Sequence, residues 1–224
     1  MEATAASGQT IQLTSEAVAV LRAELKGPLL GPGEPGYDDA RSVWNGMIDR
    51  RPALIARCVG TADVVAGVNF ARTHGVTLSV KGGGHNIAGL AVADGGLTLD
   101  LSLMRGVWVD ASARVAHTQG GCLLGDVDRE TQLDGLAAVL GFVSNTGVAG
   151  LTLGGGFGYL TRRFGWTSDN VRSIRIVLAD GRIVRASEHE HADLFWGLRG
   201  GGGNFGVAVD FEYAGVGGSR VRDS

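Results

Sequence analysis

The feature that most constrains this chain is an apolar, strand-like run that ends in three consecutive glycines. The run is Val76–Val80, and Lys81-Gly82-Gly83-Gly84-His85-Asn86 follows it directly. Glycine adopts positive φ at little cost and has no side chain to keep a ligand away. Consecutive backbone N–H groups in such a turn can converge on an anion. We therefore predict a loop that binds a phosphate-bearing cofactor, with the Lys81 charge beside it and the His85 imidazole available for chemistry.

Glycine is also abundant in the chain as a whole. It accounts for 38 of the 224 residues, whereas about 7% is average. The glycines gather at 82–84, 154–158 and 200–203, between apolar runs. This pattern indicates tight turns around a ligand rather than low-complexity disorder. The length suits one large domain or two small, closely packed ones.

Charge and cysteine content exclude several classes of protein. The 20 basic and 23 acidic residues nearly balance, so nucleic acid is not an expected partner. Cys58 and Cys122 are too few for a disulfide framework and fit a reducing compartment. No signal peptide and no apolar run of membrane-spanning length is visible. We expect a soluble, cytoplasmic protein with no membrane partner.

The order of the expected elements places the glycine loop at a sheet edge. We expect residues 1–13 to be mobile and Ser15 to cap a helix that ends at Gly27. A strand over 53–59, a helix from Thr61 to Gly75 and the strand at 76–80 then form a βαβ unit. The loop follows its second strand, and ligands of α/β sheets bind at such carboxyl ends.

The rest of the chain predicts a second, more β-rich region. A meander at 97–101, 106–109 and 114–118 is followed by a helix over 124–133, and Asp180-Gly181 predicts a hairpin between 171–178 and 182–186. A short helix at 191–198 and a strand at 207–213 complete it. The expected division is an N-terminal helix and connection (1–50), a first subdomain (51–118), a second subdomain (119–213) and a disordered tail (214–224).

Two sequence runs resemble known ligand-binding motifs, but the residues around them do not fit those motifs. The run Gly201–Gly206 has G-x-G-x-x-G spacing, but a helix precedes it and a strand follows, the reverse of a dinucleotide site. The run Glu188–His191 lacks H-E-x-x-H spacing, so we interpret it as a solvated turn and predict no metal.

Three glycine motifs in order are together specific for one family. They read Gly-Gly-Gly-His-Asn at 82–86, Gly-Val-Ala-Gly-Leu-Thr-Leu-Gly-Gly-Gly-Phe-Gly at 147–158 and Asp-Leu-Phe-Trp-Gly-Leu-Arg-Gly-Gly-Gly-Gly-Asn-Phe-Gly at 193–206. From about Ala53 to Tyr213 the chain resembles the berberine-bridge-enzyme-like, FAD-linked oxidases of the vanillyl-alcohol-oxidase superfamily. The resemblance implies an α+β, PCMH-type FAD-binding domain in which two α/β subdomains clasp an extended FAD.

The resemblance also implies which residues hold the cofactor. His85 is expected to be joined covalently to the flavin 8α-methyl carbon. Relatives with a second link use a cysteine at the position of Val143, so one link is expected here, with Cys122 a small buried residue. Backbone glycines of the second cluster would lie against the flavin; glycine-mediated helix packing is the alternative. The expected cofactor-binding residues are Lys81, Gly82, Gly83, Gly84, His85, Asn86, Val143, Thr146, Gly147, Gly150, Leu153, Gly154, Gly155 and Asn170.

Relatives continue into a substrate domain that covers the flavin and carries the catalytic base. That domain is expected to be missing here, so no catalytic residue is assigned. The resemblance implies an oxidase that moves a hydride from a CH–OH or CH–NH group of a small molecule to a histidyl-linked flavin and then to oxygen. The alternatives are a non-catalytic FAD-binding fragment, a site completed by a partner chain, or a nucleotide-binding module without flavin.

Overall fold

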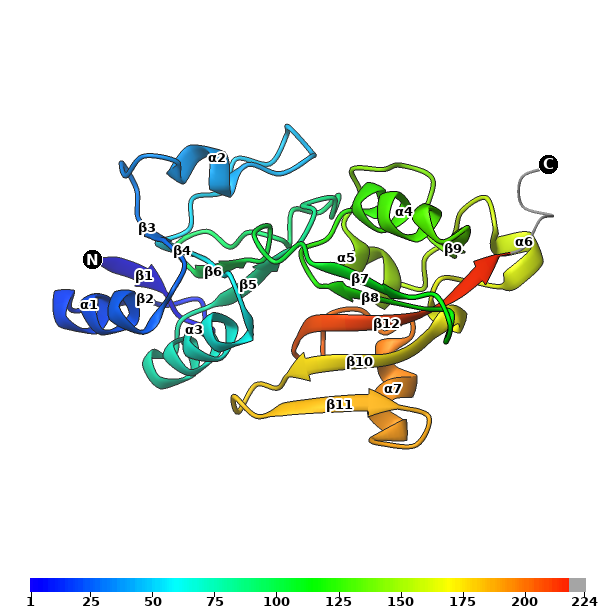
Figure 1. The fold of residues 1–224 in the computed structure, drawn as a ribbon. Helices are drawn as coiled ribbons and strands as arrows, with labels where there is room; N and C mark the ends of the chain where they lie inside the picture. Colours follow the sequence, from blue (N-terminus) through cyan, green and yellow to red (C-terminus); the bar gives the residue numbers. More distant parts are fainter. Residues whose placement is uncertain (218–224) are drawn as a thin grey trace. The chain divides into compact units, whose positions relative to one another are not determined.

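The computed structural model describes residues 1–217, which form two compact units (Figure 1). Unit 1 comprises residues 1–104 and 177–182, and of the described residues unit 2 comprises 105–176 and 183–217. The expected subdomain boundary at residue 118 falls inside a strand of unit 2, Val115–Gln119.

Unit 1 is an α/β unit built on a four-stranded sheet of order β3-β4-β6-β5. Its elements are β1 (Glu2–Thr4), β2 (Thr10–Gln12), α1 (Ser15–Glu24), β3 (Leu29–Leu30), α2 (Tyr37–Arg41), β4 (Leu54–Arg57), α3 (Thr61–His74), β5 (Leu78–Lys81) and β6 (Leu97–Asp100). β6 runs parallel to both β4 and β5. The predicted strand, helix and strand at 53–80 are confirmed, although β6 separates the two strands in the sheet.

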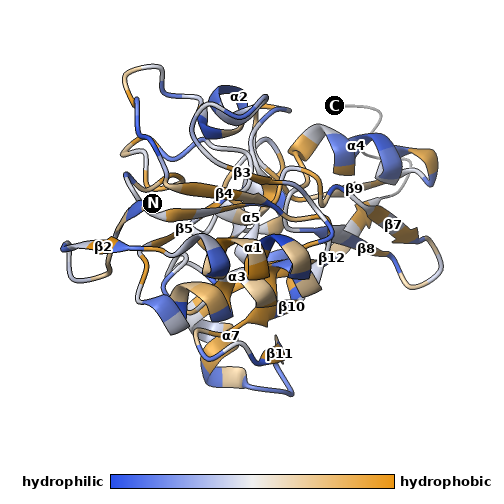
Figure 2. Cartoon of the chain, turned by 90° about the vertical axis from the view of Figure 1, so that its left-hand side faces the viewer, coloured by the Kyte–Doolittle hydropathy of each residue, from blue (hydrophilic) through white to orange (hydrophobic). Residues whose placement is uncertain are grey.

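The position of β6 follows from its sequence. All four of its residues are buried, as in a parallel strand covered on both faces. Gly67 of α3 lets the helix approach β6 closely, because a Cβ there would lie 2.4 Å from a methyl carbon of Leu99. Gly75 ends α3 with a left-handed φ of 66°. Figure 2 shows β4 in hydrophobic colours and the short α2 in hydrophilic ones.

The first thirteen residues are not the mobile segment that we expected. β1 and β2 pair as an antiparallel hairpin, with Ala3, Ala5 and Leu13 buried. The cap of α1 is also one residue earlier than predicted, since Thr14 accepts a hydrogen bond from the N–H of Ala17 at 3.1 Å. Small side chains here serve packing, which composition alone did not reveal.

Unit 2 is built on a second sheet of order β11-β10-β12-β8-β7, with β9 paired to β12. Its elements are β7 (Val107–Asp110), β8 (Val115–Gln119), α4 (Leu124–Leu133), β9 (Leu136–Ala138), α5 (Val148–Leu153), α6 (Thr161–Phe164), the 3₁₀ helix η1 (Ser168–Asn170), β10 (Val171–Val177), β11 (Ile183–Ser187), α7 (Ala192–Leu198) and β12 (Val207–Gly217). The predicted turn at Asp180-Gly181 is confirmed, with Gly181 at φ 85°.

The strand β12 explains two further departures from prediction. It alternates buried Val209, Phe211 and Tyr213 with partly exposed Asp210 and Glu212, as expected for a sheet with one face on a core. It continues to Gly217 by pairing with β9, so residues 214–217 are strand rather than tail, and 218–224 lie outside the described residues. The expected three-strand meander is reduced to β7 and β8, because β6 joins the parallel sheet of unit 1.

Candidate functional site

The loop Gly82–Asn86 leaves the carboxyl end of β5, where Leu101 donates its N–H to the carbonyl of Lys81 at 2.8 Å. Within the loop itself, none of the five backbone N–H groups donates to an acceptor among residues 1–217. Backbone donors in a folded chain are nearly always paired with protein, water or ligand. A row of five open donors therefore has the chemistry of an anion site.

A glycine is required at the centre of this loop. Gly84 has a φ of 70°, a region that L-residues rarely adopt. Its carbonyl accepts the N–H of Trp44 at 3.1 Å, which fixes the plane of the following peptide. The space beside it allows ordinary contact, since a Cβ at this position would lie 3.6 Å from its nearest neighbour, the Cα of Val43. Backbone conformation, rather than crowding, selects glycine here.

His85 follows the glycine run directly, and its side chain contacts the segment before β4. Its ring is half-buried and stacks on the indole of Trp44, with centroids 5.4 Å apart and planes at 20°. Neither ring nitrogen makes a hydrogen bond to a described residue. An imidazole that is held by a ring face and free at its nitrogens can act as a nucleophile.

Lys81 and Asn86 have internal partners in the structure. The Lys81 ammonium donates to the carbonyl of Ala40 in α2, and burial lowers its pKa. The Asn86 Oδ1 accepts the N–H of Leu90 at 3.0 Å. Both side chains therefore hold the ends of the loop. The sequence analysis missed the loop partners Trp44 and Asn45, which no periodic pattern marks.

In unit 2, the predicted cofactor residues from Val143 to Gly155 form a turn and the short helix α5. The first residue of α4, Leu124, donates its N–H to Thr146 O in the turn at 3.0 Å, and the first residue of α5, Val148, donates to Cys122 O at 2.9 Å. Val143 and Gly150 are exposed. Leu153 is buried, and its carbonyl accepts the N–H groups of Gly200 and Gly202.

The remaining predicted residues of unit 2 lie at the ends of α5 and in a separate turn. Gly147 precedes α5 with extended φ, Gly154 follows the helix, and Gly155 has a φ of 101°. Asn170 is the last residue of the 3₁₀ helix η1, and its side-chain amide donates to the carbonyls of Phe164 and Trp166 at 3.0 and 2.8 Å. In unit 2 the structure thus brings together 143–155, while Asn170 stabilises its own loop.

Cys122 is fully buried, as the sequence predicts. Its thiol donates to the carbonyl of Gly106 at 3.3 Å, and burial raises its pKa to about 12. A thiol in that state is a poor nucleophile. Within residues 1–217, no three His, Cys, Asp or Glu side chains lie close enough to hold a metal ion. Within the same residues, no helix is both long and apolar enough to cross a bilayer.

Comparison with protein families decides the assignment. The family model described as "FAD binding domain" matches residues 52–187, more than half of the chain. This chain belongs to that family. The predicted berberine-bridge-enzyme-like relationship and the PCMH-type fold are both confirmed.

Individual relatives are similar over most of this chain. (R)-6-hydroxynicotine oxidase from Paenarthrobacter nicotinovorans is 40% identical over 188 residues, which cover 84% of this chain and 41% of the relative. Glucooligosaccharide oxidase from Sarocladium strictum is 42% identical over 181 residues, 80% of this chain and 36% of the relative. The crystal structure of 6-hydroxy-D-nicotine oxidase from Arthrobacter nicotinovorans superposes with a TM-score of 0.86 at 37% identity, covering 92% of this chain and 44% of that one. The chain thus spans about two fifths of the length of these relatives.

Proposed function

We propose that this chain binds FAD and forms the flavin-carrying part of an FAD-linked oxidoreductase. The observation that carries the proposal is the Gly82–Asn86 loop, which combines five open N–H donors with an imidazole that has no polar partner among the described residues. Such donors suit the cofactor's pyrophosphate, since oriented amides bind anions without a formal positive charge.

The residues around the loop fit a diphosphate. From Val80 to Ala93 the chain carries no acidic side chain, so no carboxylate competes for the amides. Asp100, the buried residue paired with Lys81 in the sheet register, forms an ion pair with Arg57 at 3.1 Å. The predicted residues of unit 2 (Val143, Thr146, Gly147, Gly150, Leu153, Gly154, Gly155 and Asn170) remain part of this proposal as binders of the same cofactor.

His85 is proposed as the single point of covalent attachment, through a bond from a ring nitrogen to the flavin 8α carbon. Its nitrogens are unengaged, which supports a nucleophilic role. A second link is not proposed, because Val143 has no nucleophilic atom and the Cys122 thiol is buried with a raised pKa. Lys81 would act on the loop geometry rather than as a direct phosphate contact, given its bond to Ala40.

Bound FAD would supply the capacity to accept a hydride from a CH–OH or CH–NH group and to pass electrons to oxygen. The chain's own part is to bind and orient it. The names of the relatives state that they oxidise a nicotine derivative or an oligosaccharide. For this chain we propose only the general substrate class, a small-molecule alcohol or amine. A non-catalytic FAD-binding fragment, or a site completed by a partner chain, is the second candidate. A reducing compartment such as the cytoplasm would suit the two free, buried thiols.

The intact mass of the purified protein tests the proposal. We expect one added FAD, and flavin absorbance that stays with the denatured chain. His85→Ala should lose the acid-stable flavin while retaining dissociable FAD. His189→Ala, which removes an exposed histidine of unit 2, is the matched control and should keep the link. A colourless protein with no affinity for added FAD would contradict the proposal.

Peroxide production with panels of alcohols, amines and sugars separates the two candidates. Turnover by the FAD-loaded chain alone supports an oxidase. Full flavin loading without turnover supports the fragment, and turnover that appears only with a second polypeptide supports a partner chain.

A further inference from the structure

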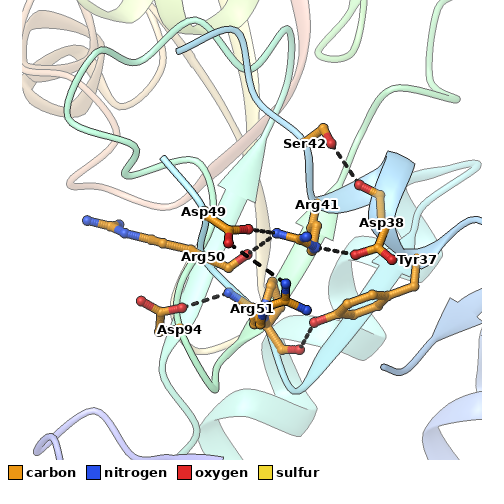
Figure 3. A network of polar contacts seen from close by, with 9 residues as sticks. Tyr37, Asp38, Arg41, Ser42, Asp49, Arg50, Arg51 and Asp94 are labelled. Atoms are coloured by element: carbon orange, nitrogen blue, oxygen red, sulfur yellow. Dashed lines mark hydrogen bonds and ion pairs between the residues drawn. The ribbon is translucent and has the colours of Figure 1, made fainter. Parts of the chain in front are cut away.

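A segment of unit 1 between α2 and β4 contacts the glycine loop, and no sequence pattern singles it out. A polar network holds the C-terminal end of this segment, Val43–Arg51 (Figure 3). The Arg41 guanidinium lies between the carboxylates of Asp38 and Asp49. At the same end, Arg51 donates its backbone N–H to Asp94 at 2.6 Å. The segment is therefore a braced structure rather than a loose connection.

Three residues of the braced segment bond to the main chain on both sides of His85. Trp44 donates its N–H to Gly84, immediately before His85. Asn45 donates its side-chain amide to Ile87, two residues after it, at 2.9 Å. Arg50 donates to the carbonyls of Gly89 and Val92 at 2.8 and 3.0 Å. These bonds use carbonyls only, so they orient the loop without consuming its N–H groups.

The side chain of Trp44 adds the contact that reaches the imidazole itself. The indole is 63% exposed, so burial contributes little to holding it in place. Its near-parallel stack on His85 covers one ring face, and offset aromatic pairs are worth about 0.5–1.5 kcal/mol beyond the area they bury. A single exposed tryptophan needs no special explanation. Trp44 does need an explanation, because its backbone N–H bonds to Gly84 and its ring stacks on the next residue, His85.

We propose that Trp44 is a positioning residue for His85: its indole restrains the imidazole so that the ring nitrogens present their edge for attachment of the flavin. This inference rests on the proposed function, because it assigns a residue to the same attachment step. In that step a C–H bond of the 8α methyl group would break, and its electron pair would pass to the isoalloxazine. A ring nitrogen of His85 would bond to the 8α carbon and lose its own proton, and the two protons released would be taken up as the isoalloxazine becomes its reduced form. Molecular oxygen, the acceptor already proposed, reoxidises it.

The test is the rate at which flavin-free protein acquires acid-stable flavin after FAD is added. We expect Trp44→Ala to attach flavin about two- to tenfold more slowly than the unmodified chain, the factor that the stacking free energy allows. Trp44→Phe keeps an aromatic face and should attach at close to the original rate. Trp196→Ala removes a 77%-exposed tryptophan from unit 2 and should change nothing. Dissociable FAD affinity, measured separately with His85→Ala and His85→Ala/Trp44→Ala, should agree within about twofold.

Several outcomes would overturn the inference. An unchanged attachment rate in Trp44→Ala removes the positioning role but leaves the proposed function standing. An equal loss of dissociable FAD affinity would make Trp44 a binding residue instead. Chains that bind no FAD at all would remove the proposed function and this inference together. If Trp44→Ala fails to fold, Trp44→Leu replaces it in the attachment assay. NMR then tests the stacking itself: the His85 ring protons should be shifted upfield in the unmodified chain and should lose that shift in Trp44→Leu. Absence of the upfield shift in the unmodified chain would overturn the inference.

Discussion

Two glycine-rich segments of this molecule, Gly82–Asn86 in unit 1 and the cluster at 154–158 in unit 2, use glycine for different physical reasons. In the first, the loop amides have no acceptor among the described residues, and Gly84 has room for a Cβ. In the second, a Cβ on Gly156 would lie 2.6 Å from Thr167 Oγ1, and one on Gly158 would lie 1.9 Å from the carbonyl oxygen of Leu140.

This difference separates open backbone from close packing. Glycines of the first loop leave donors accessible, which is what a ligand needs. Gly158 lets two stretches of backbone approach to contact distance, and Gly156 makes room for the side chains of Thr167 and Leu151. Both glycines serve packing, the alternative that the sequence left open for this region. Gly150 and Gly155, by contrast, have no neighbour within 4 Å of a Cβ. Even within the motif 147–158, therefore, composition does not distinguish the two roles.

The largest effect should come from adding a methyl group where backbones touch. Gly158→Ala forces Leu140 to move, and overpacking of this kind costs about 1–3 kcal/mol, with the upper end expected for contact with backbone. Denaturant unfolding would measure it. Gly150→Ala is the control in the nearby helix α5, where residue 150 is exposed. This variant should raise the free energy of unfolding by about 0.5–1 kcal/mol, because alanine favours a helix over glycine. Similar losses for both variants would abolish the contrast.

A conformational rather than steric cost is expected in the first loop. Gly84→Ala places an L-residue at φ 70°, which costs about 1–2 kcal/mol. The same variant should bind FAD more weakly, because relaxing φ turns the neighbouring amides. Gly46→Ala, in the adjacent segment with nothing within 4 Å, should change stability by less than about 0.5 kcal/mol. Equal stability and FAD affinity in Gly84→Ala and the unmodified chain would remove the special role of this turn.

A smaller loss should follow from releasing α5 from its sheet. The Tyr213 and Thr152 hydroxyls are hydrogen-bonded at 2.6 Å and fully buried, and burial raises the Tyr213 pKa. Tyr213→Phe should cost about 1 kcal/mol, because Thr152 keeps its bond to Val148. Tyr159→Phe is the control: its side chain is 81% exposed, and the substitution should leave the free energy of unfolding unchanged. A neutral Tyr213→Phe would mean that packing alone holds α5.

The smallest effect is a pH dependence in unit 1. Burial lowers the pKa of Lys81 in the folded chain below its unfolded value of 10.5. The unfolded chain then binds more protons between the two pKa values, so this group makes stability rise with pH in that window. Urea unfolding at a series of pH values below 10.5 measures this effect. The free energy of unfolding of the unmodified chain should rise relative to that of Lys81→Met as pH rises. A constant difference across this range would show that the ammonium is not desolvated.

Local patterns predicted much of this structure because they depend on neighbouring residues. The strand before Lys81, the helix closed by Gly75, the hairpin at Asp180-Gly181 and the buried state of Cys122 were all predicted correctly. The N-terminal hairpin was missed because contacts with distant residues hold it in unit 1: Ala5 pairs with Val76, and Thr4 donates its N–H to Gly95. The extension of β12 was missed because it depends on pairing with the distant strand β9. The contacts around the loop were missed for the same reason: Asn45 bonds to Ile87 across 42 positions.

The sequence by itself determined where the chain turns on glycine, that His85 follows the first of these turns, and to which family the chain belongs. Each of these follows from side chains that are absent or present at fixed, short spacing. Only the tertiary structure decided that β6 lies between β4 and β5, that Gly158 serves packing while Gly84 serves conformation, and that Trp44 covers the face of His85. These features arise from backbone and ring contacts between segments far apart in the chain, and local composition carries no record of such contacts.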